Sequence, residues 1–197
     1  MKKTFYLVRH GQTEWNKIGR IQGLTDIPLS DFGQKQAGDI AKHLLKVGVP
    51  ISYIYTSPLK RASMTADIIS EKIGINVNKS PFLKEVCFGD AEGKIYSELP
   101  SHLKSLFDAI FVGGSNVGNV NMRLSNAETF DEVFSRFISF MDSVPADEDN
   151  VLLVTHGAFI KIVLLKFLSE DVRIGNCACF SFEYDTETKD IAKVTCI

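Results

Sequence analysis

Two histidines, each followed by a glycine, come directly after short apolar segments near opposite ends of the sequence. His10 follows residues 4–8, with Arg9 between them, and His156 follows residues 151–155. Both segments are typical of buried strands. In an open α/β sheet, ligands collect at the carboxyl ends of the strands, so neighbouring strands would bring both imidazoles and one guanidinium together. Such a cluster could bind an anion, and one imidazole could attack a phosphorus atom.

The composition is that of a globular chain with balanced charge. Its 197 residues are 45% hydrophobic, which is enough for a sizeable core in one domain. The 22 basic and 24 acidic residues argue against a nucleic-acid-binding surface or a polybasic membrane anchor. No apolar run has the length of a signal-peptide core or a membrane span. We therefore expect a cytoplasmic protein that binds neither nucleic acid nor membranes, and its oligomeric state stays open.

Strand-like and helix-like segments alternate along the chain, which indicates an α/β fold. Strands are expected at residues 4–8, 53–55, 151–155, 179–184 and 191–194, with a weaker extended piece around 82–83. Helices are expected after the N-cap residue Ser30, after Ser57-Pro58, and over residues 96–111, 128–144 and 158–168. The glycine- and asparagine-rich residues 113–119 predict a mobile loop.

The residues after the first strand resemble the signature of a known family. Residues 9–13, Arg-His-Gly-Gln-Thr, are similar to the Arg-His-Gly-x-Thr signature of the histidine phosphatase superfamily, the phosphoglycerate mutase-like proteins. Three matching residues often occur by chance, but further matches follow in the family's order. They are Asn16, residues 23–30 with Gly33 and 36–37, residues 57–62 with 65–66, residues 83–85 with Gly89 and 92–93, and residues 155–157.

The resemblance covers most of the chain and implies both a fold and a mechanism. The implied fold is a three-layer α/β/α sandwich with a mostly parallel central sheet, formed by one domain over residues 1–197. Residues 94–126 match poorly and are expected to form a variable segment that caps the substrate. The resemblance assigns the nucleophile to His10, which would form a phosphohistidine, and a phosphoryl-oxygen donor to His156. It implies that Glu85 protonates the leaving group and then activates water.

The residue types suit phosphoryl transfer, which depends on positioning and on stabilising three negative oxygens. Arg9 and Arg61 present paired donors that match phosphate geometry and keep their charge. Asn16 would add a neutral amide donor. Gly11 and Gly157 are expected to keep side-chain bulk away from the bound anion.

No set of metal ligands is evident in the sequence. His10 and His156 lack a third His or Cys at a spacing suitable for zinc. Cys177 and Cys179 are expected to alternate along one strand, and two thiolates do not complete a tetrahedral site. We therefore expect these cysteines to pack in the core, and we expect a reaction without metal or cofactor.

The expected function is hydrolysis of a small phosphomonoester, such as a sugar phosphate or another phosphorylated metabolite. The main alternative is a phosphoglycerate mutase. Mutases of the resembled kind are longer and carry an arginine-rich middle insertion, whereas residues 86–126 contain Lys94, Lys104 and Arg123 as their only Lys or Arg. A second alternative is a non-catalytic member that binds phosphorylated ligands, which is disfavoured because such a protein needs no proton donor.

The identity of the substrate stays open at this stage. Gln22, Gly23 and the segment 94–126 are expected to determine it. Where the family usually has Gly-Glu-Ser before the late helix, this chain has Ala-Glu-Thr at residues 127–129. The departure leaves open whether Glu128 keeps the structural role of the family's glutamate.

Overall fold

A six-stranded mixed sheet forms the centre of the computed structural model, which describes residues 2–108, 125–167, 172 and 174–197. The strand order is β3-β2-β4-β1-β5-β6. The strands are β1 (Lys2–Arg9), β2 (Tyr53–Thr56), β3 (Val77–Lys79), β4 (Val151–Thr155), β5 (Cys179–Asp185) and β6 (Ile191–Cys196). The loop expected at residues 113–119 lies outside the described residues.

The two strands that carry the histidines are neighbours in the sheet, which is the condition under which the sequence predicts that the two imidazoles meet. Strands β3, β2, β4 and β1 run parallel to one another, whereas β5 and β6 are antiparallel to their neighbours. Arg9 at the end of β1 lies opposite Thr155 at the end of β4. The residues that follow these strands, His10 and His156, therefore meet at the carboxyl edge of the sheet.

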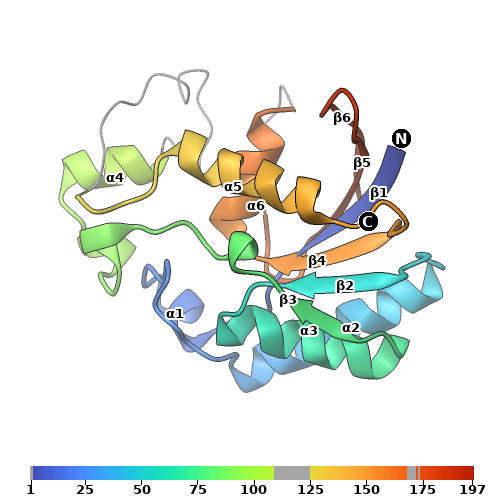
Figure 1. The fold of residues 1–197 in the computed structure, drawn as a ribbon. Coiled ribbons are helices and arrows are strands. Elements are labelled where there is room, and N and C mark those ends of the chain that lie inside the picture. Colours follow the sequence, from blue (N-terminus) through green and yellow to red (C-terminus); the bar gives the residue numbers. More distant parts are fainter. Residues whose placement is uncertain (1, 109–124, 168–171, 173) are drawn as a thin grey trace.

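Helices cover both faces of the sheet, so the expected three-layer sandwich is confirmed (Figure 1). Helices α2 and α3 lie on one face and α5 and α6 on the other. Alternate residues of β1 face the two cores: Phe5 and Leu7 pack on the α5–α6 side, and Tyr6 and Val8 on the α2–α3 side. The helices are α1 (Glu14–Lys17), α2 (Asp31–Lys46), α3 (Lys60–Ile73), α4 (Ser101–Asp108), α5 (Phe130–Ser143) and α6 (Gly157–Leu165), with 3-10 turns η1 (Pro81–Leu83), η2 (Gly89–Ala91) and η3 (Tyr96–Glu98).

Of the two helix caps expected from the sequence, one is confirmed and one is wrong, and a third cap was not expected. The Ser30 side chain accepts a hydrogen bond from the Gly33 N–H and caps α2, as predicted. Thr129 and Glu132 form a capping box at the start of α5. The expectation of a Ser57 cap for α3 is wrong, because the N-cap residue is Leu59 and the Ser57 hydroxyl accepts the Leu59 N–H ahead of the helix instead. Helix α3 begins three residues later, after Leu59.

Several other helices and strands differ from those expected from the sequence. The helix expected over 96–111 is divided into η3 and α4, because Pro100 holds Leu99 in an extended conformation. The piece around 82–83 is the 3-10 turn η1 and not a strand. Residues 109–111 and 168 of the expected helices lie outside the described residues. Strand β3, with only three residues at a sheet edge, was not expected.

The prediction that Cys177 and Cys179 alternate along one strand is wrong. Strand β5 begins at Cys179, whose side chain packs in the core. Cys177 precedes the strand with a φ of 56°, and its N–H donates to the Arg9 carbonyl. A left-handed residue at this point turns the chain across the end of β1. Among the described residues, none of the helices is long and apolar enough to cross a bilayer.

Aromatic side chains dominate the core between the sheet and α5–α6, which leads to a stability prediction. The fully buried ring of Phe137 contacts the rings of Phe159 and Phe182. Phe137→Ala should lower the free energy of unfolding by about 3–5 kcal/mol, because it removes buried contacts and leaves a cavity. Phe32→Ala, at a side chain that is 55% exposed on α2, is the matched control and should cost far less. Equal losses in urea denaturation would contradict this packing.

Candidate active site

The imidazole of His10 is buried at the end of β1 and is held in one tautomer. Its backbone N–H donates to the Thr155 carbonyl, which ties it to β4. Its Nδ1 lies 2.7 Å from the Gly11 carbonyl oxygen. Because a carbonyl only accepts, Nδ1 carries the proton. The Nε2 atom is therefore left with its lone pair, as a nucleophilic nitrogen must be.

The second imidazole, His156, lies beside the first. The two ring centroids are 5.2 Å apart and the planes are inclined by 62°. His156 is fully buried in the N-cap position of α6, with an extended backbone. Among the described residues, neither of its ring nitrogens has a hydrogen-bond partner.

Two arginines enter the same cluster, and each is fixed by backbone carbonyls. The fully buried Arg61 donates from Nη1 to the Thr25 carbonyl and from Nη2 to the Gly23 carbonyl, over 2.8 and 2.6 Å. Arg9 donates from Nη1 to the Ile174 carbonyl over 2.7 Å. These contacts occupy part of each guanidinium, and both Nε–H groups are buried without a partner in the part of the chain that the structure describes.

The unpartnered groups have the chemistry that an anion would require. The Nε atoms of Arg9 and Arg61 and both ring nitrogens of His156 are buried and unpaired. A buried polar group without a partner costs about 1–3 kcal/mol, so proteins rarely keep several in one place without a function. A bound anion with several oxygens would accept hydrogen bonds from these donors.

The electrostatics of the cluster keep both imidazoles neutral. Burial, reinforced by the positive charges of Arg61 and Arg9, holds the pKa of His10 well below its usual value near 6.5. Burial and the charge of Arg61 have the same effect on the pKa of His156. Burial also lowers the pKa of both guanidiniums, an effect that the negative charge of Glu85 opposes. Neutral imidazole is the form of histidine that can attack an electrophile.

Glu85 is buried at the N-terminus of α6, and its negative charge affects the guanidiniums of Arg9 and Arg61. Its Oε1 accepts hydrogen bonds from the N–H groups of Val86 and Phe159, each over 3.0 Å, and its Oε2 accepts from Ala158 over 3.3 Å. A helix N-terminus favours a carboxylate at this point. Its charge influences both Arg9 and Arg61, so the structure brings the predicted acid to the two predicted arginines.

Thr13 orients the two amide side chains predicted for the site. The Asn16 Oδ1 accepts from the Thr13 N–H over 3.1 Å and lies 3.1 Å from the Thr13 hydroxyl. The Gln22 Oε1 lies 3.0 Å from the same hydroxyl. With both carbonyl oxygens engaged, each amide has its NH₂ group to offer as a donor.

Gly23 serves the site through its backbone. It has a φ of 53°, and a Cβ there would lie 2.1 Å from the Glu92 Oε1. The Glu92 carboxylate in turn accepts from the N–H groups of Leu24 and Thr25. Glu92 therefore fixes the loop whose carbonyls hold Arg61.

The expectation that Gly11 makes room for the anion is wrong. A Cβ on Gly11 would lie 2.4 Å from the Gly33 carbonyl oxygen, so glycine is needed for contact with the start of α2. A Cβ on Gly157 would lie 3.1 Å from the Arg9 Nε. Gly157 thus leaves space for a guanidinium that faces the anion site.

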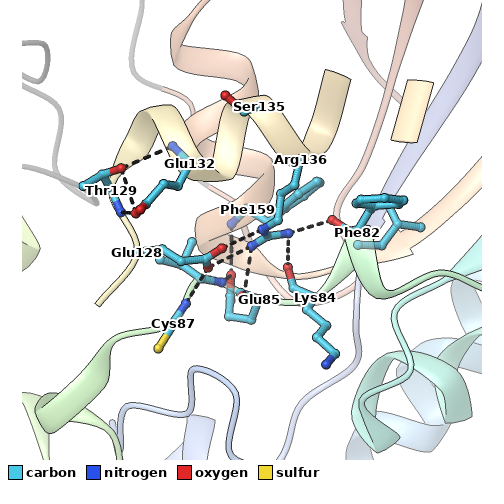
Figure 2. Close-up of polar contacts among 12 residues, drawn as sticks. Phe82, Lys84, Glu85, Cys87, Glu128, Thr129, Glu132, Ser135, Arg136 and Phe159 are labelled. Carbon is cyan, nitrogen blue, oxygen red and sulfur yellow. Dashed lines mark hydrogen bonds and ion pairs between the residues drawn. The ribbon is translucent and has the colours of Figure 1, made fainter. Parts of the chain in front are cut away.

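Two residues that hold the backbone around His10 and Glu85 were not identified from the sequence. The Asn176 side chain donates to the His10 carbonyl over 3.0 Å. Arg136 donates to backbone carbonyls around Glu85 (Figure 2). Arg136 could have been found, because it is the only basic residue in α5 and lies among phenylalanines. For Asn176, the sequence gives no such indication.

The described part of the chain places no group of three or more His, Cys, Asp or Glu side chains where they could hold a metal ion. Most polar groups of the site are nitrogens that carry a proton or a positive charge; the exceptions are the His10 Nε2, one ring nitrogen of the neutral His156 and the Glu85 carboxylate. Such a donor set fits an anionic ligand better than a cation.

Comparison with known proteins identifies the family. The model of the histidine phosphatase superfamily (branch 1) matches residues 5–196. This chain belongs to that family. It is therefore an enzyme of the phosphatase or mutase type that acts on phosphomonoesters, as the sequence predicted.

Relatives of both types resemble the chain. The uncharacterized phosphatase PhoE of Bacillus subtilis is 34% identical over 188 residues, which cover 92% of this chain and 88% of that protein. The probable phosphoglycerate mutase GpmB of Cronobacter sakazakii is 31% identical, with 91% and 84% covered. A phosphoserine phosphatase variant from Entamoeba histolytica, solved with phosphoserine, superposes with a TM-score of 0.72 at 26% identity, covering 97% of this chain and 95% of that one.

The depressed pKa of each buried histidine predicts how stability depends on pH. Unfolded histidine binds a proton near pH 6.5, whereas folded His10 and His156 stay neutral at that pH. The free energy of unfolding should therefore fall as pH falls below about 6.5, by up to about 1.4 kcal/mol per group and pH unit. The double variant His10→Asn/His156→Asn should show a shallower fall in urea denaturation between pH 7 and 5. The same pH dependence in both proteins would contradict the assignment.

Proposed function

We propose that the protein hydrolyses a small phosphomonoester, such as a sugar phosphate or another phosphorylated metabolite, through a phosphohistidine on His10. The observation that carries the proposal is the set of buried, unpartnered donors of Arg9, Arg61 and His156 beside the free Nε2 of a neutral imidazole. A phosphoryl group has three oxygens to accept from these donors and a phosphorus atom for the nitrogen to attack.

In the first step the His10 Nε2 attacks phosphorus and the ester P–O bond breaks. The departing alkoxide takes a proton from Glu85, which must enter this step as the neutral carboxylic acid. In the second step a water molecule gives a proton to the Glu85 carboxylate as its oxygen attacks the phosphorus. The N–P bond breaks, inorganic phosphate leaves, and both side chains return to their starting states.

The other site residues bind and stabilise the phosphoryl group. Arg9 and Arg61 offset the negative charge of the oxygens, and His156 donates one ring N–H to them. Asn16 and Gln22 present NH₂ groups because Thr13 engages their carbonyl oxygens. Gly23 contributes indirectly, since its carbonyl holds Arg61. No metal or cofactor takes part in this scheme.

We prefer hydrolysis over the mutase reaction because residues 86–126 contain few basic side chains that could bind a second acidic group of the substrate. A mutase must bind the carboxylate of phosphoglycerate and exclude water from the phosphohistidine. Residues 86–126 offer Lys94, Lys104 and Arg123 as their only Lys or Arg. We propose that segment 94–126 caps the substrate within one domain over residues 1–197.

Because relatives include proteins named phosphoserine phosphatase, phosphoserine belongs in the first substrate screen.

The nucleophile is tested by trapping. His10→Ala should abolish turnover of a good substrate, because it removes the Nε2 lone pair that the contact between Nδ1 and the Gly11 carbonyl leaves free for attack. Alkaline quench of the wild-type protein during turnover with ³²P-labelled substrate should retain label on His10, and acid quench should lose it. Activity near the wild-type level in His10→Ala would overturn the assignment.

The proton donor is tested by the leaving group. Glu85→Gln should lower kcat/KM for a sugar phosphate by about a hundred- to ten-thousand-fold, because a sugar alkoxide needs a proton to depart. The same change should lower kcat/KM for p-nitrophenyl phosphate far less, because p-nitrophenolate leaves readily without one. Because kcat/KM reports steps up to transfer onto His10, slow hydrolysis of the phosphohistidine does not disturb the comparison.

Arg61→Ala is the control for this measurement. It should lower kcat/KM for both substrates by similar factors, since the phosphoryl oxygens are the same in each. Equal losses with Glu85→Gln on the two substrates would show that Glu85 is not the acid. Glu14 and Glu92 are weaker candidates on geometry, because Glu14 is exposed beside Lys17 and Glu92 is engaged by the loop at residues 24–25.

A further inference from the structure

Glu85 lies on a segment between η1 and η2 that has no sheet or helix of its own. Its position depends on how residues 82–87 are held. Four consecutive backbone carbonyls of this segment are engaged by two side chains. The Thr155 hydroxyl donates to the Leu83 carbonyl over 2.8 Å, and Arg136 donates to the other three (Figure 2).

The guanidinium of Arg136 reaches the segment from the middle of α5. Its Nη1 donates to the Phe82 and Lys84 carbonyls, each over 2.7 Å, and its Nη2 donates to the Glu85 carbonyl over 3.1 Å. A planar guanidinium has five N–H donors in a fixed fork, so one side chain can hold three carbonyls at a set spacing. The backbone on both sides of the Glu85 Cα is therefore held by Arg136.

Glu128 and Phe159 fix the guanidinium itself. The Glu128 carboxylate accepts from the Arg136 Nε and Nη2 over 2.9 and 3.2 Å, and it also accepts the Cys87 N–H over 2.8 Å. The Arg136 guanidinium lies over the Phe159 ring, 4.9 Å from its centroid. The N–H of the same Phe159 donates to the Glu85 carboxylate. One cluster thus touches the backbone and the side chain of Glu85.

We infer that Arg136, oriented by Glu128, is a positioning residue that aims the Glu85 carboxylate at the leaving group. This inference rests on the proposed acid role of Glu85. Arg136 itself touches no reacting atom. Its effect comes through geometry, and a displacement of about 1 Å at a catalytic group can cost on the order of a hundredfold in rate.

The test compares phenyl phosphate with p-nitrophenyl phosphate, which are similar in shape but differ in how much the leaving group needs a proton. The variant is Arg136→Lys, which keeps the positive charge near His156 and removes the planar guanidinium with its fixed N–H donors. It should lower kcat/KM for phenyl phosphate by about tenfold or more and leave p-nitrophenyl phosphate within about threefold. In a Glu85→Gln background the same change should cause no further selective loss, because the acid is already absent.

Two further variants separate positioning from general stability. Val133→Ala, at a buried residue of the same helix, is the control for a loss of stability. It should not alter the ratio of kcat/KM for phenyl phosphate to kcat/KM for p-nitrophenyl phosphate. Glu128→Gln weakens the pairing that orients the guanidinium. It should shift the ratio in the same direction as Arg136→Lys, and it serves if Arg136→Lys does not fold.

Equal losses on the two substrates with Arg136→Lys would overturn the inference, as would an undiminished selective loss in the Glu85→Gln background. These results differ from failure of the proposed function. If Glu85→Gln itself affects both substrates equally, the acid role of Glu85 and the positioning role of Arg136 are both wrong. If Glu85→Gln discriminates and Arg136→Lys does not, only the positioning role is wrong.

Discussion

The burial of positive charge at the carboxyl edge of the sheet is the constraint on which the rest of the site depends. Arg61 is fully buried, and Arg9 has an Nε that solvent does not reach. Removing a cation from water costs several kcal/mol unless other groups compensate. Backbone carbonyls and the charge of Glu85 compensate in part, and the donors left unpaired suit an anion.

Much of the surrounding structure serves to hold that charge in place. Glu92 fixes the loop whose carbonyls bind Arg61, and the glycine at position 23 makes room for the Glu92 carboxylate. Glu85 occupies the N-terminus of α6, where it balances the arginines and is held by backbone N–H groups. The same positive charges lower the pKa of His10, which keeps its imidazole neutral. In the proposed mechanism, anion binding and the nucleophilicity of His10 therefore depend on the same electrostatic arrangement.

The sequence predicts the central features because they depend on local patterns. Apolar strands ending in His10 and His156 place both imidazoles at one edge once the strands are neighbours, and Ser30 caps α2 through its own side chain. Ser57 is not the cap of α3 because it still lies at the edge of the sheet, where its backbone N–H donates to the Val154 carbonyl, and the helix begins only at Lys60. Arg136 is recognisable as the only basic residue of α5, but its role is not, since its partners are carbonyls more than 50 residues away. Every residue has a backbone carbonyl, so the sequence does not indicate which carbonyls a side chain will bind.

A crystal structure with orthovanadate tests the central claim most directly, because vanadate takes the five-coordinate geometry of phosphoryl transfer. The account predicts vanadium bonded to the His10 Nε2, with its equatorial oxygens within hydrogen-bond distance of Arg9, Arg61 and His156. It also predicts the Glu85 carboxylate beside the apical oxygen that marks the leaving group. Vanadate bound away from the His10 Nε2, or bound there while both arginine Nε–H groups and His156 stay unpaired, would contradict it.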